Sequence, residues 1–170
     1  MSVVYSYGLE YLKAGTIDGT TGAATGLASV GDIFQDTCDI TQGDPTITKL
    51  YSAQNPNTPR KSFAQPGSKT LKFSLMSNDA DTLAKYLGGT VTTVNSVKQW
   101  NAPSTYVDVE LAFELKTSDG TIIKIARGGV TAKLNYAVRT NSLFLVDVVV
   151  EVLSPKVGVL PEMIVIEPAA

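Results

Sequence analysis

The chain has 170 residues, a formal net charge of −2 and a pI near 5.1, with 44% hydrophobic and 18% charged residues. This composition supports one domain with a real core and excludes a disordered chain, while the acidic balance argues against a nucleic-acid binder. Histidine is absent and Cys38 is the single cysteine, which excludes His-dependent triads and zinc sites and any disulfide within the chain.

The beginning of the sequence lacks the charged and apolar pattern of a signal peptide. The most apolar run, residues 143–153, is interrupted by Asp147 and Glu151 and is shorter than the roughly 20 residues that a membrane-spanning helix needs. We therefore expect no membrane association, and synthesis in the cytoplasm.

The first third of the chain predicts two strands around a flexible stretch. Residues 3–14 favour an opening strand, and residues 15–29, rich in Gly, Thr and Ala, predict a mobile loop or arm. Residues 34–41 alternate between apolar and polar side chains, as in a half-buried strand. Gly43-Asp44-Pro45 then predicts a turn.

A long hairpin is predicted over residues 46–75. Its strands are expected at residues 46–52 and 70–75, on either side of an extended tip at residues 54–67. The tip is expected to be irregular because proline removes the backbone donor that a strand interior needs. The tip prolines are Pro56, Pro59 and Pro66.

One short helix is predicted at about residues 78–87. Asn78 is the expected N-cap, with Asp81 three residues later as in a capping box, and Gly88 supplies the left-handed residue that ends the helix. A helix of about three turns needs packing against a sheet for its stability.

The second half of the chain predicts strands only. The clearest is residues 106–116, where one face is apolar and the other carries three carboxylates. Strands are also expected at 122–126, after the turn at Asp119-Gly120, and at 130–137, 143–153 and 163–166, the last within a C-terminal tail at 154–170. Strand 143–153 is apolar on both faces, so its second face, with Leu145, Val149 and Leu153, needs a cover, either the helix or a neighbouring subunit.

A search for catalytic or ligand-binding motifs predicts no catalytic residue, no metal and no cofactor. Ser68-Lys69 lacks an accompanying oxyanion motif, and Gly88-Gly89 and Gly128-Gly129 are not followed by the Lys-Ser/Thr of a phosphate loop; they predict a helix cap and a bend.

Three aspartates and one tryptophan leave alternatives open. Asp36, Asp39 and Asp44 could supply oxygens to calcium, but their spacing lacks the Asp-x-Asp-x-Asp-Gly loop, and exposed strand carboxylates are the simpler interpretation. Trp100 is expected as a packing anchor in a loop, with sugar stacking as its alternative role.

Charge is segregated along the sequence. Five basic residues without an acidic one fall between positions 49 and 72, and four aspartates without a basic one fall between positions 31 and 44. We hypothesise that the basic hairpin of one subunit docks on the acidic surface of another in a head-to-tail contact, although two solvated faces would produce the same pattern. The residues are Lys49, Arg60, Lys61, Lys69 and Lys72, and Asp32, Asp36, Asp39 and Asp44.

Several segments, in this order, resemble the tail tube (major tail) proteins of long-tailed bacteriophages. They are Asp44-Pro45, the strand Leu71-Lys72-Phe73-Ser74-Leu75-Met76, the helix from Asp81 to Gly89, Trp100 with Ala102-Pro103, and Asp119-Gly120.

The resemblance implies a single tail-tube-like domain, folded as a small β-barrel or two crossed antiparallel sheets flanked by one helix. Six copies would form a ring, and rings would stack with other tail proteins into a virion tail tube through which DNA passes. Tubes of type VI secretion systems and contractile injection machines share that fold. The hairpin would reach between subunits or rings, and residues 15–29 would form an arm ordered on stacking.

The wall of such a tube should not be cationic, because a cationic wall would hold the passing phosphates. The candidates for this wall are the polar side chains of strands 106–116 and 143–153, namely Asp108, Glu110, Glu114, Asp147 and Glu151, for which an outer surface fits equally well. The alternative function is a monomeric β-sandwich module that binds carbohydrate or protein through Trp100 and the tyrosines.

Overall fold

The computed structural model describes residues 4–158 and 160–168, which form a mainly β structure with one short helix, α1 (Ala80–Leu87). The strands, in chain order, are β1 (Tyr11–Ile17), β2 (Ala24–Ser29), β3 (Asp39–Gln42), β4 (Thr46–Leu50), β5 (Lys61–Gln65), β6 (Lys69–Leu75), β7 (Thr90–Val94), β8 (Val97–Asn101), β9 (Val109–Lys116), β10 (Ile122–Tyr136), β11 (Phe144–Val152) and β12 (Met163–Ile166).

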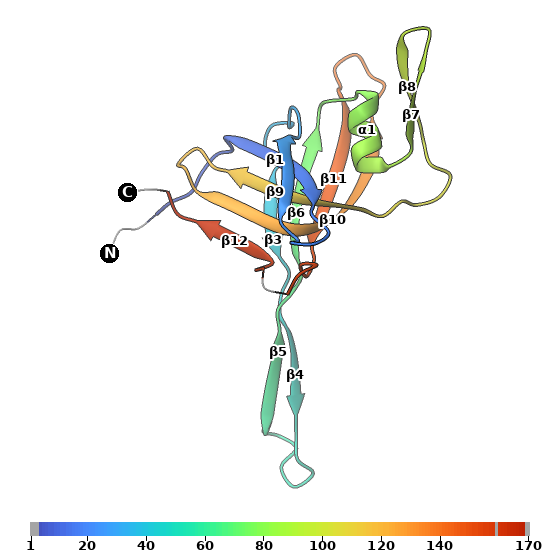
Figure 1. The fold of residues 1–170 in the computed structure, drawn as a ribbon. Coiled ribbons are helices and arrows are strands. Elements are labelled where there is room, and N and C mark those ends of the chain that lie inside the picture. The colour runs from blue at the N-terminus through green and yellow to red at the C-terminus, as the bar shows by residue number, and fades with distance from the viewer. Residues whose placement is uncertain (1–3, 159, 169–170) are drawn as a thin grey trace.

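The main sheet is antiparallel and has the strand order β2-β1-β9-β10-β11-β6-β3, with β12 paired to β10. In Figure 1 strands β9 and β12 run across the view, whereas β3, β6 and β11 run nearly at right angles to them. Two further two-stranded sheets, β4-β5 and β7-β8, project from the body. The predicted class of crossed antiparallel sheets with one helix is confirmed, and no described sheet closes into a barrel.

Strand β10 connects the two directions of the sheet. Its first half pairs with β12 and its second half with β11, while β9 lies along its other side. Residues 122–126 and 130–137 were expected as separate strands with a bend at Gly128-Gly129; the structure corrects this to one strand with a bulge between Ile125 and Gly128. The bulge adds a residue to β10 and bends it, so one strand serves both halves.

Gly128 is required at this bulge for steric reasons. A Cβ atom placed there would lie 2.3 Å from Cγ1 of Val150, a fully buried and stiff side chain, whereas a Cβ at Gly129 would meet Cδ1 of Leu153 at 3.1 Å. We expect Gly128→Ala to lower the free energy of unfolding by about 1–3 kcal/mol, as overpacking does. Gly129→Ala is the matched control and should cost less; equal losses in urea denaturation would contradict this explanation.

The core lies on one face of the main sheet, under α1. Phe73 of β6 is its centre, with ring centroids 6.2 Å from those of Tyr86 in α1 and Phe113 in β9. The predicted apolar face of residues 106–116 is confirmed from Leu111 to Leu115, although the strand begins only at Val109. Val146, Val148 and Val150 of β11 complete the core, as the alternation of that strand predicts.

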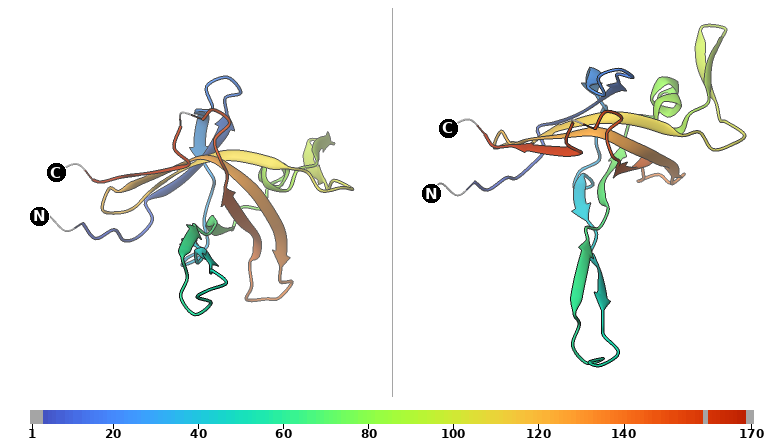
Figure 2. Two further views of the ribbon diagram at one scale, coloured as in Figure 1. Left: turned by 90° about the horizontal axis from the view of Figure 1, so that it is seen from below. Right: turned by 60° about the horizontal axis from the view of Figure 1, so that its bottom comes forward.

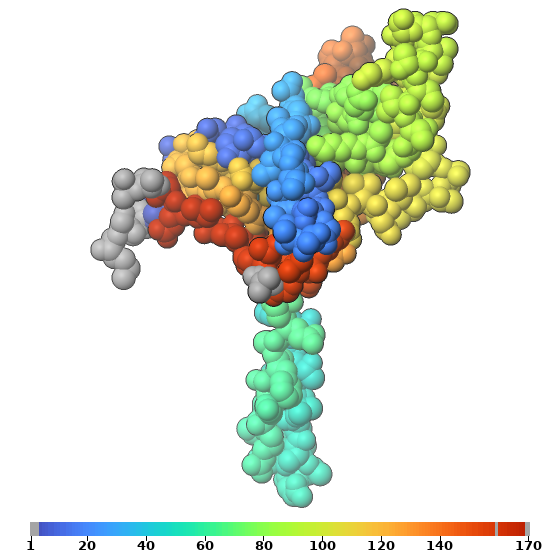
Figure 3. Space-filling view, viewed as in Figure 1, coloured from blue at the N-terminus to red at the C-terminus, as the bar shows by residue number. Residues whose placement is uncertain are grey.

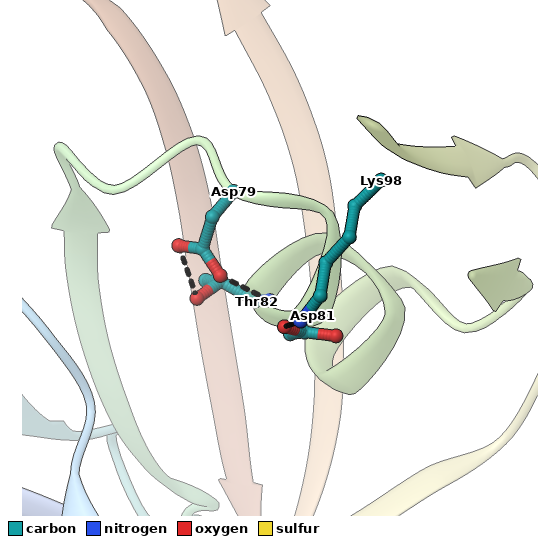
Figure 4. A network of polar contacts seen from close by, with 4 residues as sticks. All are labelled: Asp79, Asp81, Thr82 and Lys98. Atoms are coloured by element: carbon teal, nitrogen blue, oxygen red, sulfur yellow. Dashed lines mark hydrogen bonds and ion pairs between the residues drawn. The ribbon is translucent and has the colours of Figure 1, made fainter. Parts of the chain in front are cut away.

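The structure confirms the predicted helical segment but has a different N-cap residue. Asp79 is the N-cap: its carboxylate accepts hydrogen bonds from the Thr82 backbone N–H at 3.0 Å and from the Thr82 hydroxyl at 2.8 Å (Figure 4). The expected cap, Asn78, instead accepts a hydrogen bond from the Tyr136 hydroxyl. Asp81 pairs with Lys98 of β8, and Gly88, at φ 74°, ends the helix as predicted.

The N-terminal quarter is more regular than its composition suggests. Residues 15–29, expected as a loop or arm, contain the end of β1, a turn and β2. Strand β2 pairs with β1 from Lys13–Ser29 to Ile17–Ala24, with a register shift between Ala14 and Thr16. The prediction of a loop is therefore wrong. A strand forms through backbone hydrogen bonds, which do not require large side chains. The predicted mobility stays a prediction. The expected opening strand at 3–14 begins only at Tyr11, and Val3 lies outside the described residues.

Asp119 holds the segment before β1 against the β9–β10 turn. Its carboxylate accepts hydrogen bonds from the Thr121 and Ser6 hydroxyls at 2.8 and 3.1 Å, and the Ser118 N–H donates to the Tyr7 carbonyl. Hydrogen bonds from Thr117, Thr121 and Ser6 lower the pKa of Asp119 from 3.8 to about 2.

The lowered pKa predicts an acid-sensitive attachment of this segment. A carboxyl group with a lower pKa in the folded state stabilises that state above pH 3.8, and the contribution disappears as the pH falls toward 2. We expect the NMR signals of Tyr7 and Ser118 to change in that window, and the change to be absent in Asp119→Asn, where the segment is already loosened at neutral pH. Identical titrations in both proteins would contradict this attachment.

The long hairpin is built differently from its prediction. Strand β4 pairs with β5, not with β6, and β6 pairs with β3 and β11. The predicted tip at 54–67 therefore contains a regular strand, β5, and the irregular turn is confined to residues 51–60. The two pairs of strands join where Gly67 packs against Gly43, so closely that a Cβ on Gly67 would lie 2.2 Å from the Gly43 carbonyl oxygen.

The C-terminal part confirms the predicted strand at 163–166, which is β12. Residues 159, 169 and 170 of the predicted tail at 154–170 lie outside the described residues. Within the described part of the chain, no helix has the length and hydrophobicity that crossing a membrane requires.

Candidate assembly surfaces

The β4-β5 hairpin is the most prominent surface feature of the molecule. It extends away from the body as a narrow arm in Figures 1 and 3 and in the right-hand view of Figure 2. Its two strands form a separate sheet with five cross-strand pairs, from Thr46–Gln65 to Leu50–Lys61. Every residue of both strands is exposed, so neither face of the ribbon is covered by the rest of the chain.

The arm combines exposed apolar side chains with positive charge. Ile47, Leu50 and Phe63 keep 57%, 50% and 46% of their surface exposed. Leu50 pairs with Lys61 and Thr48 pairs with Phe63, and the two pairs are two residues apart along the strands, so all four side chains are on one face. The Lys61 ammonium lies 4.8 Å from the Phe63 ring centroid. No acidic residue occurs from position 45 to position 78.

The structure divides the five predicted basic residues into two groups. Lys49, Arg60 and Lys61 are on the arm, exposed to solvent. Lys69 and Lys72 are on β6 in the body, where Lys69 lies 3.7 Å from Glu162 and Lys72 is directly opposite Asp39 of β3. Within the described part of the chain, Lys49, Arg60 and Lys61 form no ion pair, so their charges are available to a partner.

The four predicted aspartates are all exposed and are spread over three parts of the chain. Asp32 and Asp36 belong to the connection between β2 and β3, Asp39 is on β3 beside Lys72, and Asp44 is at the base of the arm. Among the described residues no three carboxylate, cysteine or histidine groups converge as metal ligands.

The outer face of the main sheet, opposite the core, brings two predicted sets of residues together. Leu145, Val149 and Leu153 alternate with the buried valines of β11 and are half-buried. Cross-strand register places Asp147 and Glu151 on this same face, and Glu110 joins them through Gly129 of β10. Helix α1 packs on the core side, so it does not cover this face. Three of the predicted contact residues and three of the predicted wall residues thus occupy one surface.

Most of the predicted wall carboxylates have partners in the same molecule. Glu110 lies 2.5 Å from Arg127 and 3.3 Å from Lys156, and the hydrogen bond from Arg127 is the main cause that lowers the Glu110 pKa. Glu114 accepts from the Tyr11 hydroxyl at 2.9 Å, and Asp147 from Ser74 Oγ at 2.7 Å.

The remaining two wall candidates, Asp108 and Glu151, are exposed, and neither forms an ion pair with the part of the chain that is described. They line a shallow depression of about 280 Å³ over Gly129, together with Val149 and Leu153. The face is therefore mixed in character, with acidic groups around an apolar floor.

Trp100 is a packing anchor, although on a strand rather than in a loop. Its indole Nε1 donates to the Gly88 carbonyl at 2.8 Å, which ties β8 to the end of α1. The side chain is half-buried in this position. The hydrogen bond uses only Nε1, and sugar stacking by the remaining exposed part of the ring stays a prediction.

No protein-family model matches this chain, and no curated protein matches it.

The structure also contains a groove that the sequence did not reveal. It has a volume of about 520 Å³ and lies between the segment before β1, the β2–β3 connection and strands β9 and β10. Cys38 lies in it, and burial raises the pKa of this thiol to about 11. Its lining comes from four separate parts of the chain, so no local motif marks it; it includes Leu9, Ile33, Phe34, Ile40, Leu115 and Ile123.

Proposed function

We propose that this chain is a structural subunit that assembles with copies of itself into stacked rings, forming the tail tube of a bacteriophage or a tail-like particle. The observation that carries this proposal is the β4-β5 arm, which exposes apolar side chains on both faces. An isolated two-stranded hairpin is marginally stable in water. A partner that covers the arm would provide the missing packing.

The outer face of the main sheet supports the same proposal. Val149 and Leu153 are partly exposed there beside Asp108 and Glu151, so the face has apolar area for contact and acidic groups that do not hold phosphate. We propose that the acidic part lines the passage for DNA and that subunits, six to a ring, meet around it, with other tail proteins at the ends of the tube.

The test is the mass and shape of the purified chain in solution. Sedimentation velocity and negative-stain images should show rings or tubes, with less assembly at high salt because the arm carries Lys49, Arg60 and Lys61. A stable monomer at high concentration and low salt would overturn the proposal. Assembly that is indifferent to salt would remove the charge contribution and leave apolar contact alone.

A second candidate function is a monomeric module that binds carbohydrate or protein. The observation in its favour is a set of tyrosines with more than half of their surface exposed, since tyrosine is a common contact residue in recognition sites. A monomer that binds a glycan in an array would favour this function over the tube subunit. These tyrosines are Tyr5, Tyr7, Tyr51 and Tyr106.

A further inference from the structure

We propose that the groove beside Cys38 receives the β4-β5 arm of a second copy of this chain. This inference rests on the proposed function and adds to it the site of contact and the side chains that meet there. The arm and the groove are different surfaces, so the contact is head-to-tail and each copy can both give an arm and receive one.

The groove is lined mainly by apolar side chains and carries one carboxylate. Leu115 is buried, and Ile33, Ile40 and Ile123 are half-buried around it, so their remaining surface faces the opening. Among the described residues that line the groove, Asp36 is the one charged side chain, and none is a lysine or arginine. A partner that offers apolar side chains with positive charge beside them is therefore the complementary occupant.

The arm has this combination on one face. Phe63 and Leu50 are neighbours there, each about half exposed, and Lys61 stands beside the Phe63 ring. A groove of about 520 Å³ is large enough for an aromatic ring and a leucine together, since pockets for small ligands begin at roughly 300 Å³. With Phe63 in the groove, its ring would contact the apolar lining and Lys61 would lie toward Asp36. Buried aromatic anchors of this kind commonly dominate the binding energy.

One molecule cannot make this contact with itself in the observed conformation. The arm points away from the body in Figure 1 and in the right-hand view of Figure 2, and the groove belongs to the body. The close packing of Gly67 on Gly43 holds the two connections at the base of the arm together. The occupant must therefore be the arm of another copy.

The inference can be tested by photocrosslinking of the full chain. The photoreactive analogue p-benzoylphenylalanine replaces Phe63, and the crosslinked peptides of the assembled protein are mapped by mass spectrometry. We expect adducts on the segments around residues 33–40 and 115–123 of a second copy. The matched control carries the analogue at Val97 on the β7-β8 hairpin, which is 61% exposed against 46% for Phe63, and should give no such adducts.

A charge reversal provides an independent measurement. Asp36→Lys should weaken self-association at low salt at least tenfold, and Lys61→Glu in the same chain should restore most of the loss if the two side chains meet. Adducts from position 63 that map elsewhere, or no restoration by the second substitution, would overturn the inference.

The outcomes also separate this inference from the proposed function. Rings or tubes without groove adducts would leave the proposed function standing and remove the groove as the receiving site. Groove adducts in open chains of subunits, without rings or tubes, would support the contact and remove the tube.

Discussion

Removal of the β4-β5 arm should abolish assembly and leave the body folded. The change replaces residues 46–65 with a short Gly-Ser linker between Pro45 and Pro66. The body should fold because β4 and β5 pair only with each other, and the hydrogen bond from the Gly43 N–H to the Ser68 carbonyl, 2.9 Å, closes the base of the arm independently. Assembly should be lost because the deletion removes the exposed apolar and basic side chains together.

The measurement is the sedimentation profile of the shortened chain, beside its thermal unfolding. We expect a folded monomer with an unfolding midpoint within a few degrees of the parent. A matched control shortens the other projecting hairpin: Val94–Val97 is replaced with Asn-Gly, which suits a tight turn because Asn95 and Ser96 both have positive φ. Rings or tubes formed by the armless chain would contradict the assembly role of the arm.

The same substitution at two phenylalanines should separate stability from assembly. Phe73 is 2% exposed and contacts the rings of Tyr86 and Phe113, so Phe73→Ala should lower the free energy of unfolding by about 3–5 kcal/mol. Phe63 is 46% exposed on the arm, so Phe63→Ala should change the stability of the free subunit by about 0.5 kcal/mol or less.

Assembly should be affected more by Phe63→Ala than by Phe73→Ala. Under conditions in which both variants remain folded, Phe63→Ala should raise the concentration needed for assembly, while Phe73→Ala should leave it nearly unchanged because its side chain faces no partner. Urea denaturation measures the change in stability, and light scattering against protein concentration measures assembly. A large loss of stability in Phe63→Ala would show that the arm packs within its own molecule.

Local patterns predicted the elements of the body well. The alternation of residues 109–116 and 144–152 sets which side chains are buried, because slipping either strand by one residue would move carboxylates into the core. The helix was predictable for a similar reason: its apolar stripe and Gly88 specify the segment. The cap was misplaced by one residue, since Asn78 and Asp79 can both serve and the contact with Tyr136 occupies Asn78.

The errors concern pairing between distant or weakly apolar segments. Residues 24–29 have little to bury, yet they form β2 because β1 offers a free edge of backbone groups. Strand β5 was hidden by the neighbouring prolines Pro59 and Pro66, which lie outside the paired residues. Amino-acid composition reports on side chains, whereas β2 and β5 form through backbone hydrogen bonds. Composition therefore did not reveal these two strands.

The amino-acid sequence by itself determined the mainly β class, the short helix, the apolar faces and the positive charge of the hairpin, because each follows from the order of neighbouring residues. Only the tertiary structure decided that β4 pairs with β5, that Lys72 lies opposite Asp39, and that residues from four parts of the chain form the groove beside Cys38. The reason is physical: periodicity sets which way a side chain points, but long-range strand pairing sets what it meets.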